Sequence, residues 1–308
     1  MLVPKWSPGL FAFFGLGIVS AIVGLVPWLI TGMRLPLQNL WGTDALPAQM
    51  PIALLPFSQY YVSFIVALIL VGSTIAGIVG RATTARKTRA ALVALMGGVL
   101  IIQVVATAQT AMTVSGGLSD RSASTLYLVA LTGGTIAAIL LGLGMFTLIA
   151  RAPKPGALIA LSIAAIASSS WMRGLAFPVG TVSSSSTFTE VMRTIIELAP
   201  AIVIGAAIVW CGVNSVGRMT AVISSLILLW MGPVFITAGS SAAGTRVLAP
   251  YPSEMLEYGV QVFRSALLMP ELWAYSLAIA VGIAAVGLVG VRSASKVSAR
   301  SDQASGTR

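Results

Sequence analysis

Long apolar runs alternate with short polar segments along almost the whole chain. An α-helix rises about 1.5 Å per residue, so about 20 apolar residues cross the roughly 30 Å hydrocarbon core of a bilayer. The runs are continuous, whereas strands of a membrane β-barrel would alternate between apolar and polar positions. The pattern therefore predicts an all-α, polytopic bundle of about eight transmembrane helices. The expected spans are residues 10–30, 59–80, 91–114, 125–150, 157–177, 195–217, 219–239 and 272–291.

Composition agrees with this reading of the pattern. The 308 residues are 57% hydrophobic and 8% charged, and the mean hydropathy is +0.97, whereas soluble domains carry about 25% charged residues. We expect one transmembrane domain, residues 1–292. The polar, small residues 293–308 predict a disordered tail.

Charge is distributed unevenly between alternate connecting segments. One set carries most of the cations and a single acid, Asp302; the other set carries the remaining seven acids. Because cation-rich segments stay in the cytoplasm, the cation-rich set and both termini are expected inside, in a protein of the cell (cytoplasmic) membrane. The cations of that set are Lys5, Arg81, Arg86, Lys87, Arg89, Arg151, Lys154, Arg218, Arg292, Lys296, Arg300 and Arg308.

The stretch RATTARKTRA, residues 81–90, is the densest group of cations. Arg81, Arg86, Lys87 and Arg89 predict a cytoplasmic anchor that binds anionic lipid headgroups. Docking of a cytoplasmic partner is the alternative. The net charge of +10 is thus a matter of topology, and we expect no nucleic-acid partner.

Several chemistries lack their usual residues. There is no histidine and only one cysteine, Cys211, so we expect no metal site and no cofactor. Paired carboxylates and nucleophile motifs are also missing from the sequence, so we do not expect an enzyme. The one residue that suggests otherwise is Asp44 in the first outer loop. It is either a turn residue or the base of an outer-face lipid-linked transferase.

Polar residues within the expected spans are the first candidates for a functional site. Gln103, Thr107 and Thr110 lie on one side of the third span. They form either a polar track for a substrate or a set of interhelical hydrogen bonds.

A second candidate group lies near the outer ends of spans five to seven. Glu197 is the acid expected to reach into the membrane, and Arg193 and Arg173 are its candidate partners. Pro200 and Pro233 are expected to interrupt their helices near this charged group. The group is either part of a substrate pathway or an interfacial ion pair whose side chains reach water.

Residues 250–270 predict an amphipathic helix at the outer surface. Pro252 and Ser253 favour its start and Pro270 its end. Such a helix suits a lid, a docking face for an envelope partner, or interfacial packing.

Two function classes follow from these patterns. The first is a permease or translocation component for a weakly polar or lipid-like substrate, which requires a polar cavity near Gln103 and Glu197. The second is a non-catalytic accessory or scaffold subunit of a cell-envelope assembly, which requires a tightly packed bundle and a membrane or envelope partner. A lipid-linked transferase resting on Asp44 is a third. The four helical hairpins also allow an internal repeat.

Overall fold

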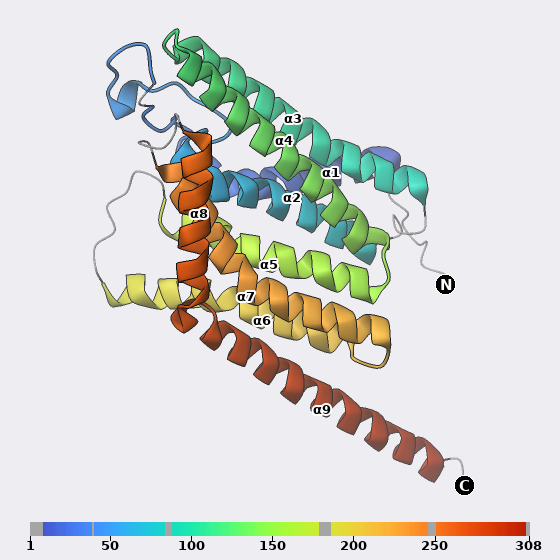
Figure 1. The fold of residues 1–308 in the computed structure, drawn as a ribbon. Coiled ribbons are helices and arrows are strands. Elements are labelled where there is room, and N and C mark those ends of the chain that lie inside the picture. Colours follow the sequence, from blue (N-terminus) through green and yellow to red (C-terminus); the bar gives the residue numbers. More distant parts are fainter. Residues whose placement is uncertain (1–8, 39, 84–87, 179–185, 246–250, 306–308) are drawn as a thin grey trace.

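The computed structural model describes residues 9–38, 40–83, 88–178, 186–245 and 251–305 (Figure 1). These residues form nine α-helices and short 3₁₀ turns, and their only bridges between extended residues are two isolated ones. The helices are α1 (Leu10–Leu29), α2 (Val62–Ala82), α3 (Arg89–Gly117), α4 (Ser122–Arg151), α5 (Lys154–Ala176), α6 (Thr187–Cys211), α7 (Val216–Gly244), α8 (Pro252–Leu267) and α9 (Ala274–Ser305).

Eight of these helices, all but α8, are long and apolar enough to cross a membrane. The prediction of an all-α, multi-pass membrane bundle is confirmed. Among the starts of the helices, the largest shift is at α6, which begins at Thr187 rather than at 195. The side chain of Ser186 accepts a hydrogen bond from the Thr189 backbone, and this cap starts the helix within a stretch expected to be spacer.

Successive spans run in opposite directions, so the turns fall at two ends of the bundle (Figure 1). One end holds the start of α1, the end of α9 and the short turns α4–α5 and α6–α7. We call it the cation-rich end because Arg81, Arg89, Arg151, Lys154 and Arg218 lie there. The opposite, loop-rich end holds residues 30–61 and α8.

Glycines allow α1 to lie unusually close to its neighbours. A Cβ atom on Gly24 would lie 2.5 Å from the Leu68 carbonyl oxygen of α2, and one on Gly98 of α3 would lie 2.1 Å from the Phe14 carbonyl oxygen of α1. Close approach of this kind is how membrane helices gain packing energy where lipid offers no hydrophobic driving force. Because α4 in turn packs on α2 and α3, the first four helices form one tightly packed unit.

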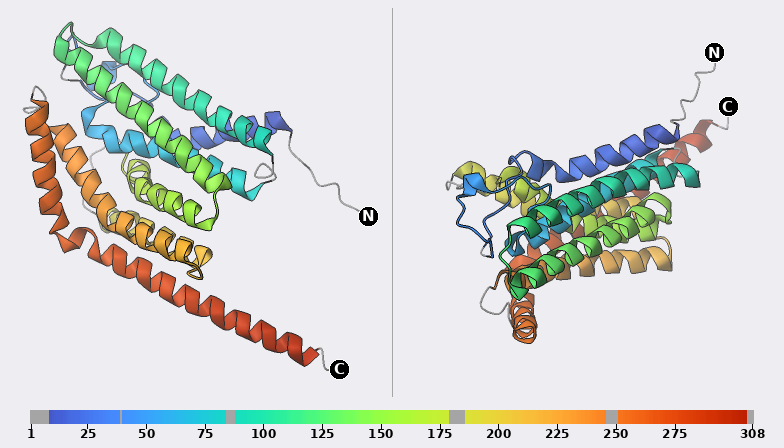
Figure 2. Two further views of the ribbon diagram at one scale, coloured as in Figure 1. Left: turned by 45° about the vertical axis from the view of Figure 1, so that its right-hand side comes forward. Right: turned by 90° about the horizontal axis from the view of Figure 1, so that it is seen from above.

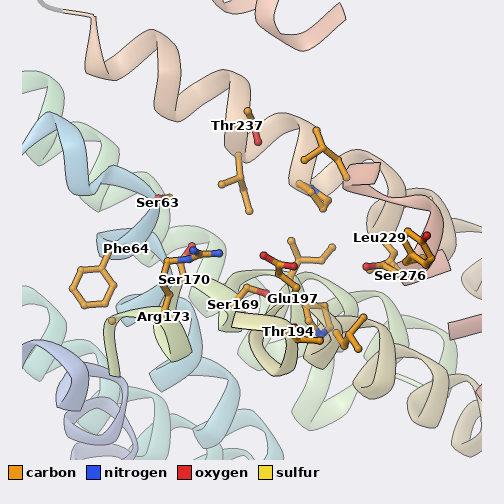
Figure 3. Close-up of a pocket in the computed structure, with 18 of the residues that line it drawn as sticks. Ser63, Phe64, Ser169, Ser170, Arg173, Thr194, Glu197, Leu229, Thr237 and Ser276 are labelled. Atoms are coloured by element: carbon orange, nitrogen blue, oxygen red, sulfur yellow. The ribbon is translucent and has the colours of Figure 1, made fainter. Parts of the chain in front are cut away.

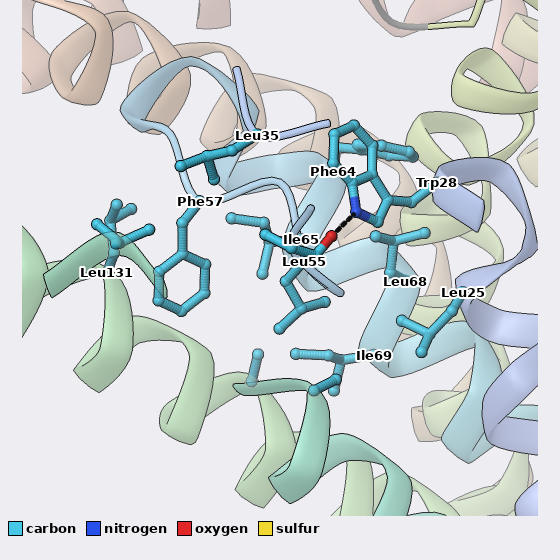
Figure 4. Close-up of a cluster of buried hydrophobic side chains, with 14 of the residues drawn as sticks. Leu25, Trp28, Leu35, Leu55, Phe57, Phe64, Ile65, Leu68, Ile69 and Leu131 are labelled. Carbon is cyan, nitrogen blue, oxygen red and sulfur yellow. Dashed lines mark hydrogen bonds between the residues drawn. The ribbon is translucent and has the colours of Figure 1, made fainter. Parts of the chain in front are cut away.

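The first loop of the loop-rich end is folded rather than loose. Leu35, Met50 and Phe57 are fully buried in it. The Trp28 indole donates a hydrogen bond of 2.8 Å to the Ala53 carbonyl (Figure 4). This loop caps α1–α4 and fixes the start of α2.

The last two helices differ from the rest in position. The helix expected near residues 250–270 is present as α8, which packs on α7 through a Phe235–Phe263 contact with ring centroids 4.9 Å apart. Helix α9 lies along the outside of the bundle against α6 and α7 (Figures 1 and 2). Its backbone stays helical to Ser305, whereas the small, polar composition from residue 293 onwards predicts a disordered tail. Small polar residues permit helix formation when an existing helix is extended, because only nucleation is costly.

Replacing Gly98 by alanine tests the α1–α3 packing. The new methyl group would overlap the Phe14 carbonyl, so we expect the helices to separate and the melting temperature in detergent to fall by several degrees. Gly97→Ala is the matched control, because its Cβ would lie 3.8 Å from the nearest neighbouring atom. Equal melting temperatures for the two variants would contradict the packing described here.

Candidate functional site

A cavity of about 960 Å³ lies among the spans near the loop-rich end. The start of α2 and the end of α5 form one side, and α6, α7 and the start of α9 form the other (Figure 3). Its lining combines apolar, hydroxyl and charged side chains. The hydroxyl and charged members are Tyr60, Tyr61, Ser63, Ser169, Ser170, Arg173, Thr194, Glu197, Thr237, Glu271, Tyr275 and Ser276.

Four of the residues singled out from the sequence line this cavity. Arg173 and Glu197 point into it from α5 and α6, and both side chains are exposed to it (Figure 3). Pro200 of α6 and Pro233 of α7 complete the set. Residues from three helices, separated by up to 60 positions in the chain, therefore meet around one space.

The expected ion pairs of Glu197 are not formed. In the part of the chain that the structure describes, Glu197 makes no ion pair within 4.0 Å, either with Arg193 or with Arg173. Arg193 is exposed outside the cavity lining. Spacing of four residues made the pair sterically easy, but holding two long, exposed side chains together costs entropy. Glu197 instead faces the cavity.

The expectation that Pro200 and Pro233 interrupt their helices is wrong. Both α6 and α7 are continuous α-helices with the proline inside. Pro200 has no N–H, so the Ile196 carbonyl four residues earlier loses its helical donor. The Ser169 hydroxyl of α5 donates to that carbonyl at 3.4 Å. A side chain of a neighbouring helix thus replaces the missing bond.

The polar face of the third span does not reach the cavity. Gln103 donates to the Ile69 carbonyl at 3.0 Å and to the Ser73 hydroxyl at 3.1 Å, which ties α3 to α2. Thr107 donates to the Gln103 carbonyl of its own helix. Thr110 accepts from the Leu55 backbone at 2.9 Å and so holds the first loop. These three residues are structural hydrogen-bonding groups here, and the substrate track proposed for them is not seen.

The cations of the predicted cytoplasmic anchor differ in burial. Arg81 is half-buried: it donates to the carbonyls of Ile149 at 2.7 Å and Ala152 at 3.0 Å, and it lies 4.9 Å from the centroid of the Trp210 ring. Arg81 therefore joins α2, α4 and α6. Arg89 is exposed, whereas Arg86 and Lys87 lie outside the described residues.

Other candidates do not come together with the cavity. Asp44 is exposed in the first loop and is not among the cavity's lining residues. Among the described residues, no group of three His, Cys, Asp or Glu side chains could hold a metal ion.

The sequence patterns did not indicate the hydroxyl groups or Glu271 as members of this site. A readable signal existed in the spacing, because Ser169 and Ser170 precede Arg173 by four and three residues on one face of α5. Thr194 precedes Glu197 in the same way on α6. No such spacing in the sequence indicates that Glu271, just before α9, lines the same cavity.

Arg81→Gln tests the structural role found for this cation. The variant loses charge-assisted bonds to two carbonyls, which we expect to lower the free energy of unfolding by about 2 kcal/mol. Thermal unfolding in detergent measures the change, and exposed Arg89→Gln is the control with the same loss of charge. If both variants melt at the temperature of the parent protein, Arg81 acts only as a lipid-facing charge.

Comparison with known protein families, with curated proteins and with solved structures finds no match to this chain. The cavity's own side chains, and their place among the membrane-spanning helices, are therefore the basis for assigning a function.

Proposed function

We propose that this integral membrane protein is a permease or translocation component for a weakly polar or lipid-like substrate. The cavity of about 960 Å³ among its spans is the observation that carries the proposal. Ligand sites in proteins usually enclose about 300–1,000 Å³. A scaffold subunit would gain stability from filling this space with side chains, because empty space in a bundle forfeits packing contacts.

The chemistry of the lining supports a substrate with both apolar and polar parts. Phe64, Ile166 and Ile236 contribute hydrocarbon surface, while Ser170 and Thr237 contribute hydroxyl groups. A freely hydrated ion would gain little from the first set, and a pure hydrocarbon would leave the second set unpaired. A partly polar molecule uses both.

The position of the cavity also suits a transport cycle. It lies where α5, packed against α2 and α4, meets the outer halves of α6 and α7. Helices α6, α7 and α9 contact the α1–α4 unit less extensively than they contact α5 and each other. Rocking of the second group against the first would open or close the cavity, as in transporters whose sites lie between two bundles.

The orientation follows from the charges. With the cation-rich end in the cytoplasm, the cavity opens towards the outer face of the membrane. The cytoplasmic location of both chain ends is part of this proposal.

An accessory role in an envelope assembly is the second candidate. It draws on α8, which packs on α7 but leaves Leu256 and Tyr258 exposed at the loop-rich end. An envelope partner would bury these side chains. The large cavity nevertheless has no role in a purely structural subunit, so we place transport first.

Accessibility of a single cysteine distinguishes the two roles. Cys211 is buried and is the chain's one cysteine, so Cys211→Ser gives a background without thiols. In that background we expect Ser170→Cys, in the cavity, to react with a membrane-impermeant maleimide from the outer side and, in a second population, from the cytoplasmic side. Labelling of intact cells and of inverted vesicles measures the two reactions.

Ser162→Cys is the matched control on the same helix. Ser162 is fully buried and outside the cavity, so this thiol should stay unlabelled from both sides. Labelling of Ser170→Cys from the outer side alone, under all conditions, would indicate a fixed outer vestibule and would contradict a permease.

A further inference from the structure

Charges of both signs surround the cavity on different elements. Arg173 projects from α5, Glu197 from α6, and Glu271 lies on the 3₁₀ turn Pro270–Leu272 before α9. Figure 3 shows Arg173 and Glu197 on separate walls of the space. One cation and two carboxylates are thus presented to whatever occupies it.

These charges are poorly satisfied by the protein itself. Within the described chain, neither Arg173 nor Glu197 makes an ion pair within 4.0 Å. A charge near hydrocarbon is costly unless water, a counter-charge or a ligand compensates it. A ligand that brings one negative and one positive group would compensate both at once.

The surroundings of each charge indicate which ligand group suits it. Arg173 and Ser170 lie one turn apart on α5 and both line the cavity. A planar guanidinium binds phosphate oxygens through paired hydrogen bonds, and a hydroxyl adds another donor. Glu197 and Glu271 offer carboxylate oxygens, which accept hydrogen bonds from an ammonium group.

An apolar groove continues from the cavity along the outward side of α6. This groove is a shallow, open hollow of about 250 Å³ on the surface of α6, and it shares Thr194 and Leu198 with the cavity. Its other members are Ile195, Ala199, Ile202 and Val203. Ile195, Ile202 and Val203 are about half exposed, so the groove faces the lipid side of the helix.

We propose that the substrate is a zwitterionic phospholipid. Its phosphate binds Arg173 and Ser170, its ammonium group binds Glu197 and Glu271, and a hydrocarbon chain lies in the α6 groove. The proposal rests on the proposed function, in that it takes the cavity to be the substrate site. It adds the substrate class and a route by which the chain stays in the membrane while the headgroup enters the protein.

Other lipid classes fit the charges less well. A purely anionic headgroup would satisfy Arg173 and approach two carboxylates. A purely cationic headgroup would satisfy the carboxylates and approach Arg173. Like charges at close range are unfavourable, more so where water is scarce, so the site discriminates by charge pattern rather than by net charge.

Native mass spectrometry of the full-length protein in mild detergent tests this assignment. The probes are phosphatidylethanolamine, phosphatidylglycerol and a trimethylammonium lipid, all with identical chains. We expect phosphatidylethanolamine to bind about tenfold more tightly than either of the others. Arg173→Gln should weaken phosphatidylethanolamine and phosphatidylglycerol about tenfold. Glu197→Gln should weaken the binding of phosphatidylethanolamine only. The double variant with Glu271→Gln should bind phosphatidylethanolamine and phosphatidylglycerol equally.

The matched controls are Glu254→Gln and Arg264→Gln on α8, which are exposed and outside the cavity. They should bind all three lipids as the parent protein does. Arg173 and Glu197 make no ion pair to lose, so their variants should keep the parent melting temperature. If a variant unfolds, Ser170→Ala, which removes one phosphate donor, provides the second test.

Each result decides the proposal. Equal binding of the three lipids, or binding unaffected by the cavity variants, would overturn it. Glycerophosphoethanolamine, the headgroup without chains, should compete weakly; competition as strong as by the lipid would show that the groove is unused and would also overturn it. Charge-selective binding without two-sided labelling of Ser170→Cys would support the ligand class and refute transport. Two-sided labelling without charge-selective binding would support transport and refute the ligand class.

Discussion

Hydrocarbon offers no hydrogen bonds, and this constraint governs the placement of polar groups throughout the chain. Helices satisfy the backbone within each span. Several buried hydroxyls donate to the carbonyl four residues earlier in their own helix: Ser20, Thr107, Thr135, Ser162 and Ser225. Gln103 and Arg81 bond instead to neighbouring helices. These polar groups therefore form hydrogen bonds within the bundle and stabilise it.

In the cavity, by contrast, some polar groups are not taken up by bonds within the bundle. Pro200 leaves the Ile196 carbonyl of α6 without its helical donor, and the Ser169 hydroxyl of α5 donates to that carbonyl instead. Arg173 and Glu197 face the open cavity. Such an arrangement is stable only with water or a ligand present. Its location between the tightly packed α1–α4 unit and the more loosely attached α6, α7 and α9 gives a physical reason to associate it with movement of a substrate.

The sequence predicted the fold well, because span length and hydropathy are local properties and the bilayer allows few alternatives. It also identified Glu197, Arg173, Pro200 and Pro233, since rare polar and helix-bending residues stand out within apolar runs. It failed where distant segments decide the outcome. Whether Thr110 faces a substrate or the first loop depends on how residues separated by 55 positions meet. The place of Glu271 in the cavity lining depends on the same kind of non-local contact, as does the position of Arg81 beside Trp210.

A density map of the protein in lipid nanodiscs, determined by electron cryo-microscopy, tests the central claim most directly. That claim is an open, charged cavity that accepts an amphiphile from the membrane. The account predicts elongated density between Arg173 and Glu197 that continues along Ile195 and Ile202. A closed space in which Arg173 and Glu197 form an ion pair, with the loop-rich halves of α6 and α7 packed together, would contradict it.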